Sequence, residues 1–352
     1  MNPLIKWPGG KSGEYKYIKD LIPDYDKYIE PFFGGGAIFF KLEPKKAIIN
    51  DINQDLTNFY QNIKERNKYF LELLIFFADE WEAISNLINE KEKQIIHLFG
   101  NKESAEVDTY NLLFSEYTFK EHYIDVVNLK QQIIKNLKSK IRRTKKITDE
   151  TTTNDDIVRN IEAAVKSGIY MHFRDVYNKK IRELTSEEKA AVFFFIREFC
   201  YASMFRYNKN GDFNIPYGGI GYNRKNFRLK VDYIASNEVF QQLKNVEIFN
   251  EDFEDLILKK ATSKDFIFLD PPYDSEFKDY DKNPFGKDDQ KRLADTLSKT
   301  EAKFILIIKQ TEFISGLYKS RGFKIESFEK TYLYNVRGRN DREVNHLLIY
   351  NF

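Results

Sequence analysis

Cysteine is almost absent from this chain, whose 352 residues include only Cys200. A single cysteine excludes an intramolecular disulfide and a zinc cluster built from cysteines. Histidine is also scarce, and its 4 positions, His97, His122, His172 and His346, lack the spacing of metal ligands. We therefore expect no metal site.

The chain also lacks a marked charge excess and a long apolar run. Lys and Arg number 56 against 54 Asp and Glu, so the net charge is +2 and a polyanionic partner would need a local basic patch. No apolar run approaches a membrane span, and the start, MNPLIKWPGGKSGEYK, contains no signal segment. These absences predict a soluble, intracellular protein of one or two domains.

Strand-like and helical stretches alternate at both ends of the sequence. KYIEPFFGGG and KAIINDIN are predicted as short strands that run into turns, and QDLTNFYQNI as a helix. The later strands are predicted at NVEIFNEDF, DFIFLDPPY, KFILIIKQ, FKIESFEK and HLLIYNF. This rhythm predicts a parallel, doubly wound α/β sheet.

Residues from about 70 to about 200 have a different character. Helical periodicity runs through LELLIFFADEWEAISNLI, VDTYNLLFSEYTFKEHYIDVVNLKQQIIKNL and SEEKAAVFFFIREF. The basic run KSKIRRTKK fits a solvated helix end slightly better than a DNA contact. NKNGDFNIPYGG then predicts a hairpin, because Gly211 supplies the positive φ of a tight turn. The pattern indicates one sheet domain, interrupted between its second and third strands by a largely helical insertion.

The stretch FIFLDPPY ends an apolar strand with a carboxylate, two prolines and an aromatic ring. The prolines stop the strand and hold Asp270 and Tyr273 at its end, where ligands bind in open α/β sheets. A carboxylate and a main-chain carbonyl that accept both N–H bonds of an exocyclic amine would localise its lone pair, while the ring stacks on the base. Alone, the motif fits a strand end with a polyproline turn equally well.

A second glycine-rich motif, EPFFGGGAIFF, follows the first predicted strand. Gly34–Gly36 lets the backbone approach a ligand at the start of a helix, although Phe39 stands where the dinucleotide fingerprint needs its third glycine. Asp51, after the next strand, is placed to accept ribose hydroxyls. The missing glycine argues against a pyrophosphate ligand. Taken alone, the glycines also fit a merely tight turn, and Asp51 also fits a helix cap.

The stretch KWPGGKS near the N-terminus only superficially suggests a phosphate-binding loop. Ile5 stands where the Walker pattern requires glycine, and no strand precedes the motif. An NTPase is therefore rejected. Trp7 and Lys11 remain as a flat ring and a cation to which the pattern alone gives no task.

Taken in order, these motifs resemble the Dam-like D12 class (alpha group) of S-adenosylmethionine-dependent DNA adenine N6-methyltransferases. The matching stretches are KWPGGK, EPFFGGG, NDIN, NEDF and DPPY. FRYNKNGDFNIPYGG resembles the family's DNA-contacting hairpin, FGKDDQKRLADTL the helix after its catalytic loop, and REVNHLLIYNF its closing strand. The resemblance covers residues 1–60 and about 190–352; the stretch between has no clear counterpart in the compact members.

The resemblance implies an α/β fold, in which a Rossmann-like doubly wound methyltransferase sheet carries an inserted, largely helical DNA-recognition domain with a β-hairpin. Residues 1–65 and 230–352 would form the catalytic domain that binds S-adenosylmethionine. Residues 66–229 would form the helical target-recognition domain, with the hairpin near 206–218.

The resemblance also assigns roles to residues by position, and these are expectations. S-adenosyl-L-methionine would contact Trp7, Lys11, Glu30, Pro31, Phe32, Gly34, Gly36, Asp51, Asp252, Phe253 and Asp270. The catalytic residues would be Asp270, Pro271, Pro272 and Tyr273. The residues in contact with DNA would be Lys6, Tyr201, Arg206, Asn208, Lys209, Asn210 and Pro216.

Within that DNA set, Tyr201 would wedge beside the vacated base and Arg206 would contact either a guanine edge or a phosphate. Ala202 departs from the family, since it replaces an amide residue that follows the wedge in close relatives. Lys6, Arg206 and Pro216 make a GATC-like site the best single guess for the target.

The activity implied is direct methyl transfer to N6 of an adenine flipped out of double-stranded DNA, without metal or covalent enzyme intermediate, leaving S-adenosyl-L-homocysteine. An N4-cytosine methyltransferase and a catalytically silent DNA-binding module remain alternatives. A restriction–modification system with a cognate endonuclease, or a stand-alone bacterial or phage enzyme, is the expected setting. Such an enzyme would be cytoplasmic and sufficient as a monomer.

Overall fold

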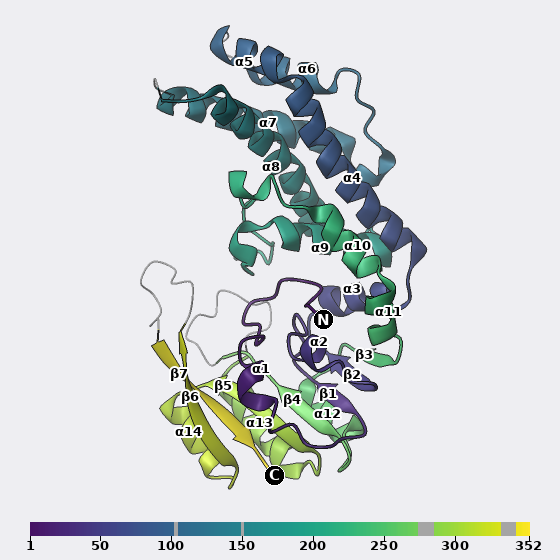
Figure 1. Ribbon diagram of the computed structural model, residues 1–352, viewed down its shortest axis with the longest axis vertical. Coiled ribbons are helices and arrows are strands. Elements are labelled where there is room, and N and C mark those ends of the chain that lie inside the picture. Colours follow the sequence, from purple (N-terminus) through teal and green to yellow (C-terminus); the bar gives the residue numbers. More distant parts are fainter. Residues whose placement is uncertain (102–104, 149–150, 274–284, 332–342) are drawn as a thin grey trace. The chain divides into compact units, whose positions relative to one another are not determined.

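The structure is a computed structural model of the chain, and it describes residues 1–101, 105–148, 151–273, 285–331 and 343–352. The chain divides into two compact units. Met1–Lys64 and Asn237–Phe352 form one, called here the sheet unit, and Glu65–Ser236 form the other, called the helical unit (Figure 1).

The sheet unit contains a 7-stranded sheet in the order β3-β2-β1-β4-β5-β7-β6. Its strands are β1 (Tyr28–Glu30), β2 (Ala47–Asn50), β3 (Val246–Phe249), β4 (Phe266–Leu269), β5 (Lys303–Lys309), β6 (Lys324–Thr331) and β7 (Glu343–Tyr350). Neighbours from β3 to β5 are parallel, so the expected α/β class and each expected strand are confirmed. Apolar strands buried on both faces explain the continuous runs in the sequence.

The far edge of the sheet departs from the parallel arrangement that the sequence predicts. β7 lies between β5 and β6 and is antiparallel to both. A parallel partner needs a crossover of about a dozen residues or more, usually a helix. Only residues 332–342 join β6 to β7, which is at the lower limit for such a crossover and favours the antiparallel pairing.

The order of the strands reverses between β1 and β4. From β1 the chain continues to β2 and β3 on one side, whereas from β4 it continues to β5 on the other. Tyr28 pairs with Phe266 and Ile29 with Ile267, so the carboxyl ends of β1 and β4 lie side by side. The EPFFGGG loop and the DPPY loop therefore begin at the same edge, at the switch point where open α/β sheets bind ligands.

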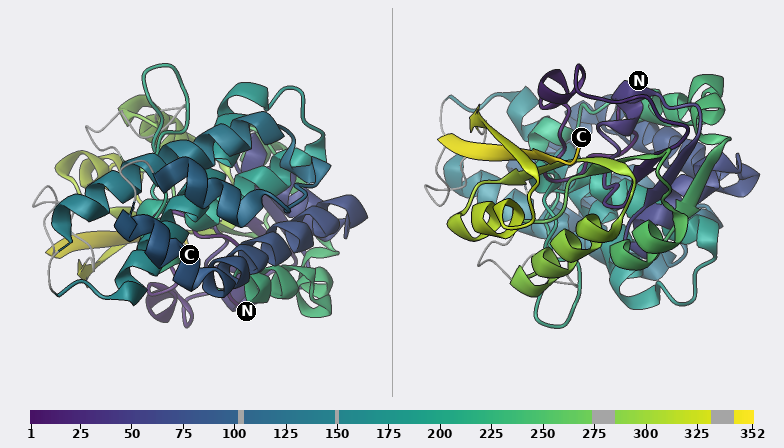
Figure 2. Two further views of the ribbon diagram at one scale, coloured as in Figure 1. Left: turned by 90° about the horizontal axis from the view of Figure 1, so that it is seen from above. Right: turned by 90° about the horizontal axis from the view of Figure 1, so that it is seen from below.

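Helices cover both faces of this sheet. They are α1 (Tyr15–Ile18), α2 (Phe39–Leu42), α3 (Gln54–Lys64), α11 (Asn237–Leu243), α12 (Phe253–Lys260), α13 (Lys287–Lys299) and α14 (Glu312–Lys319). Ile29 faces a core shared with Leu256, Leu293 and Ile314 of α12–α14, whereas Tyr28 faces Phe39 of α2. In the right-hand view of Figure 2, α13 and α14 lie on one side of the strands and α1 on the other.

The helical unit has no β-strand among its described residues. It consists of α4 (Lys68–Glu90), α5 (Glu92–Asn101), α6 (Ala105–Phe114), α7 (Val126–Ile147), α8 (Asn154–Lys180), α9 (Ser186–Phe199) and α10 (Phe227–Ala235), with short 3-10 helices η1 (Glu121–Tyr123), η2 (Tyr201–Ser203) and η3 (Ile220–Tyr222). Glycine at 168 lets α7 and α8 approach closely, because a Cβ there would meet the Ile133 backbone at 2.6 Å. The boundary expected at 229/230 falls inside α10, which packs against α4 in this unit.

The continuous helical pattern expected from residue 107 to 137 is wrong in its middle. α6 ends at Phe114 and α7 begins at Val126, where Asp125 caps the helix by accepting a hydrogen bond from Asn128 N at 2.9 Å. Between them Tyr117 and Tyr123 both donate to the Glu80 carboxylate, so tertiary contacts override the local periodicity. The basic run lies at the end of α7, as a helix end.

None of the described helices is long and apolar enough to cross a membrane.

Candidate active site

The glycine turn after β1 is shaped by close packing against the N-terminal segment. Gly34 has φ +51°, and a Cβ at that position would meet Trp7 Cδ1 at 2.6 Å. At Gly35 a Cβ would meet the Ile5 carbonyl oxygen at 3.1 Å. The structure thus brings together the KWPGGK and EPFFGGG motifs, and glycine is required because the two backbones touch.

Two side chains at the end of β2 fasten this turn to the sheet. Asp51 accepts hydrogen bonds from Gly34 N through Oδ2 and from Asn53 N through Oδ1, both at 2.9 Å. Asn50 is 1% exposed; its Nδ2 donates to the carbonyls of Pro31 and Glu251 at 3.0 Å, and its Oδ1 accepts from Glu251 N at 2.9 Å. The ends of β1, β2 and β3 are therefore tied together by a buried amide that sequence reasoning missed.

Lys11 is a buried cation at the centre of the sheet unit's candidate site. Its Nζ forms an ion pair with the Asp270 carboxylate, donates to the Gly9 carbonyl at 3.0 Å and lies 5.3 Å from the centre of the Tyr273 ring. Lys11 is 2% exposed, whereas the Asp270 side chain is 20% exposed. One ammonium thus joins the first motif to the carboxylate and ring of the DPPY loop, across 259 positions of sequence.

Glu30 lies buried at the end of β1. Tyr28 Oη donates to Glu30 Oε2 at 2.7 Å. Burial raises the pKa of Glu30 well above its usual range; the hydrogen bond from Tyr28 opposes that shift, and the nearby Asp270 charge adds to it. Glu30 is therefore suited to remain neutral within a site that already holds two carboxylates.

The DPPY loop is supported from α13. Pro271 is buried and Pro272 exposed, and the Pro272 carbonyl accepts a hydrogen bond from Gln290 Nε2 at 2.9 Å. Gln290 is 0% exposed. The Tyr273 ring meets the buried His346 ring edge-on, with centroids 5.8 Å apart. Gln290 is a second support that the sequence pattern did not reveal, since a glutamine on an amphipathic helix is ordinary.

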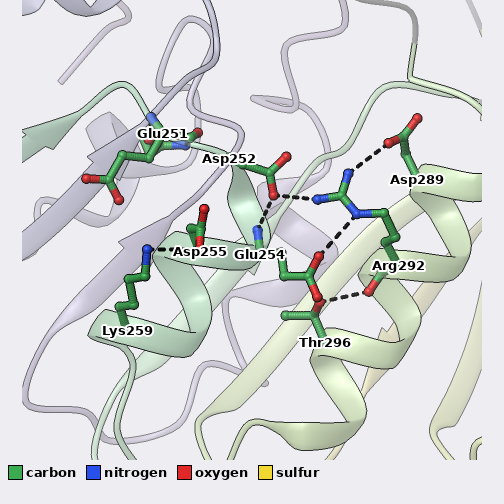
Figure 3. A network of polar contacts seen from close by, with 9 residues as sticks. Glu251, Asp252, Glu254, Asp255, Lys259, Asp289, Arg292 and Thr296 are labelled. Atoms are coloured by element: carbon green, nitrogen blue, oxygen red, sulfur yellow. Dashed lines mark hydrogen bonds and ion pairs between the residues drawn. The ribbon is translucent and has the colours of Figure 1, made fainter.

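Asp252 and Phe253 stand at the start of α12, within the network drawn in Figure 3. Asp252 Oδ1 accepts from Glu254 N at 2.9 Å and from Arg292 Nη2 at 2.7 Å. Arg292 also pairs with Glu254 and Asp289, each at 3.1 Å, and its guanidinium lies 5.0 Å from the Phe253 ring centre. Among the described residues no partner engages Asp252 Oδ2, and Figure 3 shows this oxygen turned away from Arg292.

Three phenylalanine rings adjoin that network. Phe253 lies 5.4 Å from Phe32 and 5.7 Å from Phe285, and Phe32 meets Phe285 edge-on at 5.5 Å. The sequence analysis places both Phe32 and Phe253 in the set expected to contact one ligand, and their rings are neighbours in the structure. The apolar surface beside an available carboxylate oxygen suits a flat, amine-bearing ring.

The segment that the sequence predicts as a hairpin forms two isolated antiparallel bridges, Tyr207 with Phe213 and Cys200 with Tyr217, rather than a pair of strands. Asn208 Oδ1 accepts from Asn210 N and Asp212 N, both at 2.9 Å, which closes the turn. Gly211 has φ +80°, as the turn requires. Asn208, Lys209, Asn210 and Pro216 are all exposed.

Arg206 is held in a defined position beside this turn. Its Nε donates to Asn214 Oδ1 at 2.8 Å, and Asn214 N donates to the Arg206 carbonyl at 3.1 Å. Among the described residues nothing engages the two terminal nitrogens of its guanidinium. Asn214 is a further residue that sequence reasoning missed.

Tyr201 is 54% exposed and begins a tight turn, in which Met204 N donates to the Tyr201 carbonyl at 3.1 Å. Ala202 and Ser203, the two central residues, both have φ +52°. Left-handed backbone at a residue other than glycine costs about 1–2 kcal/mol. Of the residues expected to contact DNA, only Lys6, which is exposed, belongs to the sheet unit.

No group of three or more His, Cys, Asp or Glu residues in the described part of the chain is arranged to hold a metal ion.

A sheet of this order, with two loops and buried polar anchors at its switch point, is typical of α/β enzymes that bind a nucleotide-like ligand. The family model for the D12 class N6 adenine-specific DNA methyltransferases matches residues 7–114 and 115–333, and the chain belongs to this family. It is thus an adenine-specific DNA methyltransferase, which decides between adenine N6 and the alternative at cytosine N4. The match runs through residues 61–189, where the sequence resemblance offered no counterpart.

Several curated relatives are similar over their whole length. The Type II methyltransferase M.CviBI of Paramecium bursaria Chlorella virus NC1A is 28% identical over 359 residues, with 100% of both chains covered. The Type II methyltransferase M.MjaIII of Methanocaldococcus jannaschii is 28% identical and covers 100% of this chain and 99% of its own. The DNA adenine methylase of Serratia marcescens is 24% identical and covers 98% and 96%.

Proposed function

We propose that the sheet unit transfers a methyl group from S-adenosylmethionine to N6 of an adenine flipped out of double-stranded DNA, and that the helical unit recognises the target. The observation that carries this proposal is the Asp270 carboxylate at the switch point, beside the glycine turn and fixed by Lys11. The division of the chain after Lys64 and after Ser236 supports the two assignments.

The residues present fit S-adenosylmethionine, which supplies a methyl group bound to a sulfonium. Asp252 Oδ2 and the ring of Phe253 would receive the adenine end, since a carboxylate oxygen suits an exocyclic amine. The glycine turn with Trp7 and Asp51 would receive the ribose, and Lys11 the carboxylate of the methionine part. Pro31 and Glu30 border the same turn.

The DPPY loop would prepare the acceptor amine. Asp270 forms an ion pair with Lys11, and a carboxylate can only accept hydrogen bonds. Asp270 and the Pro271 carbonyl would take both N–H groups of adenine N6 and concentrate its lone pair on nitrogen. Tyr273, held between Lys11 and His346, would stack on the base. The amine nitrogen would then bond to the methyl carbon in line as the bond from that carbon to the sulfonium sulfur breaks. S-adenosylhomocysteine would leave, and the extra proton on the amine would pass to water.

Recognition of the target would come from the exposed turn residues of the helical unit. Arg206, oriented by Asn214, keeps two terminal nitrogens for a bidentate contact with guanine. Tyr201 would occupy the space of the extruded adenine, with Asn208, Lys209, Asn210 and Pro216 along the backbone or groove. Lys6 of the sheet unit would add a base or phosphate contact, and a GATC-like site remains the proposed target.

The setting proposed is a restriction–modification system with a cognate endonuclease. Two of the relatives are named Type II methyltransferases, which supports it. All residues invoked above belong to one chain, so a monomer would suffice.

A labelling experiment tests the proposal. Unmethylated DNA and isotopically labelled S-adenosylmethionine are incubated with the enzyme, and the DNA is digested to nucleosides. We expect label in N6-methyladenine, and the absence of transfer would refute the function.

The substitution Asp270→Ala should lower turnover by at least about 1,000-fold while the cofactor still binds, because it removes the carboxylate that accepts a hydrogen bond from the amine. Near-normal turnover would refute the role of Asp270, and Asp295→Ala, an exposed carboxylate, is the control.

A further inference from the structure

We propose that Arg197 is a positioning residue that holds the Tyr201–Met204 turn in its strained form before DNA arrives, so that Tyr201 meets the duplex as a rigid wedge. This inference rests on the proposed function, in which Tyr201 takes the place of the extruded adenine. It assigns a task to a buried arginine at the end of α9, which no motif marks.

The turn needs outside support because its sequence does not favour its conformation. Its two central residues, Ala202 and Ser203, both have φ +52°, the sign that a type I′ turn requires at both positions. Such turns strongly prefer Asn-Gly, since these residues tolerate left-handed backbone. Alanine and serine lack that tolerance, so the neighbouring structure must impose the conformation.

Arg197 supplies that support from below the turn. Its Nη1 donates to the Met204 carbonyl at 2.7 Å and its Nη2 to the Ser203 carbonyl at 3.0 Å. The side chain is 0% exposed, and its guanidinium lies 4.5 Å from the centre of the Phe205 ring. A planar fork with two parallel donors fits two successive carbonyls, which a flexible lysine ammonium would not match.

Two further contacts complete the frame around the turn. The Tyr222 hydroxyl accepts a hydrogen bond from Ala202 N at 3.1 Å, and Tyr201 N donates to the Pro216 carbonyl at 2.8 Å. The base of the turn is therefore fixed while the Tyr201 ring is 54% exposed. A large ring on a fixed base loses little conformational freedom when it inserts into DNA, which favours extrusion of the target.

The structure points to a specific substitution and a specific rescue. Arg197→Met keeps the length of the side chain and removes the two donors. Replacing Ala202 and Ser203 by Asn and Gly installs the pair that forms a type I′ turn without help. If Arg197 acts through the turn, this replacement restores function to Arg197→Met; if Arg197 only stabilises the unit, it does not.

The readout is base extrusion, followed by the fluorescence of 2-aminopurine placed at the adenine identified by the labelling experiment. We expect Arg197→Met to reduce the fluorescence rise about tenfold with KM for S-adenosylmethionine unchanged, and the added Asn-Gly turn to restore most of it. Arg228→Met, which removes an exposed arginine paired with Asp79 and Asp232, is the matched control and should behave as the parent enzyme.

The outcomes separate this inference from the proposed function. If the parent enzyme gives no fluorescence rise, or Tyr201→Ala leaves it intact, the proposed extrusion by Tyr201 is wrong. If those two behave as proposed but Arg197→Met extrudes normally, only the role of Arg197 is refuted. The role of Arg197 is also refuted if the Asn-Gly turn does not restore extrusion to Arg197→Met. Circular dichroism checks that this variant is folded.

An independent observation concerns the solvent face of α7. This helix contains no Asp or Glu; its basic residues are Lys130, Lys135, Lys138, Lys140, Arg142, Arg143, Lys145 and Lys146. Lys135, Lys138, Arg142 and Lys146 recur at helical spacing, are exposed and form a stripe of about 16 Å at 1.5 Å per residue. The net charge of the chain is only +2, so this stripe concentrates positive charge in one place.

Little within the described structure balances that charge. Of the four stripe residues only Lys138 has an acidic partner among the described residues, Glu106 at 3.9 Å. On an adjacent face, burial lowers the pKa of Lys140, and the neighbouring Arg143 adds to that shift. We propose that the stripe docks on phosphates of the DNA backbone, outside the target site.

Salt dependence tests this docking surface. The variant with glutamine at 135, 138, 142 and 146 should bind DNA with a slope of log K against log[salt] that is about 3.6 smaller in magnitude, since each phosphate contact contributes about 0.9. Arg159→Gln with Lys179→Gln is the control, because both side chains already pair with carboxylates. An unchanged slope refutes the proposal.

Discussion

The two units hold the side chains proposed to act on the cofactor and on DNA by partly different physical means. In the sheet unit, Asp51 and Asp270 follow parallel strands, so hydrogen-bonded strands fix where each loop begins. In the helical unit, buried cations tie helices to loops: Arg197 holds the turn at Tyr201, and Lys166 joins α4, α8 and η3. Both units therefore bury cations, which is costly, but among the described residues only the sheet unit also has hydrogen-bonded strands that fix where its loops begin.

Lys166 gives the comparison its largest expected effect. Its Nζ donates to Ser85 Oγ at 2.6 Å and the Asn223 carbonyl at 2.8 Å, pairs with Glu162 at 2.8 Å, and is 0% exposed. Lys166→Met leaves Glu162 without its cation and should destabilise the helical unit by about 3–5 kcal/mol. Urea unfolding measures this, with Lys179→Met, an exposed lysine on the same helix, as the control. A decrease of less than about 1 kcal/mol in the free energy of unfolding would show that the helical unit does not depend on its buried cation.

His172 should make the stability of the helical unit depend on pH. Nε2 donates to the Tyr123 carbonyl at 2.6 Å, and burial lowers the pKa of His172 to about 4. In the unfolded chain His172 is protonated as the pH falls through about 6.5, whereas in the folded chain it is protonated only near pH 4. The free energy of unfolding should therefore fall by up to about 3 kcal/mol between pH 6.5 and 4. Unfolding of His172→Gln across this range should lack that component. An identical slope in parent and variant would contradict the assignment.

Gly34→Ala probes the backbone contact in the sheet unit. A Cβ there would meet Trp7 Cδ1 at 2.6 Å and would also occupy a positive φ, so the turn must move. We expect a loss of about 2 kcal/mol in S-adenosylmethionine binding, measured by calorimetry, with DNA binding retained. Gly9→Ala is the matched control, because it shares a positive φ but has nothing within 4 Å. Equal effects at both glycines would show that the contact with Trp7 is unimportant.

Arg228→Ala should have the smallest effect. Arg228 pairs with Asp79 at 2.5 Å and Asp232 at 2.9 Å, yet its side chain is 43% exposed. Exposed ion pairs contribute less than about 1 kcal/mol, so the melting temperature should change by only a few degrees. A loss comparable to that of Lys166→Met would mean that burial does not distinguish the two cations.

The sequence predicts the loops of the sheet unit better than the supports beneath them. Apolar runs that end in Gly or Pro are local signals, so the strands before EPFFGGG and DPPY could be located. Asn50 and Gln290 carry no such signal, because their partners lie 201 and 18 positions away and are backbone groups that any residue possesses. The antiparallel edge could not be predicted, because an apolar strand pattern does not specify the direction in which a strand pairs.

The helical unit was harder to predict for a related reason. Helical periodicity locates α4 and α9 but extends through residues 115–125, where Tyr117 and Tyr123 instead converge on Glu80. Arg197 resembles any arginine in the last turn of a helix. Its role depends on the carbonyls of Ser203 and Met204, which reach its guanidinium only because the chain turns back after Tyr201. A helical pattern in the sequence does not predict such a contact.

The two points at which the chain leaves and re-enters the sheet unit belong to α3, which ends at Lys64, and α11, which begins at Asn237. These two helices pack against each other, and the strands before and after them, β2 and β3, are neighbours. A short linker could therefore bridge the excision, at a small cost in loop-closure entropy. If the helical unit recognises the target as proposed, one such unit could be exchanged for another without breaking a strand of the sheet.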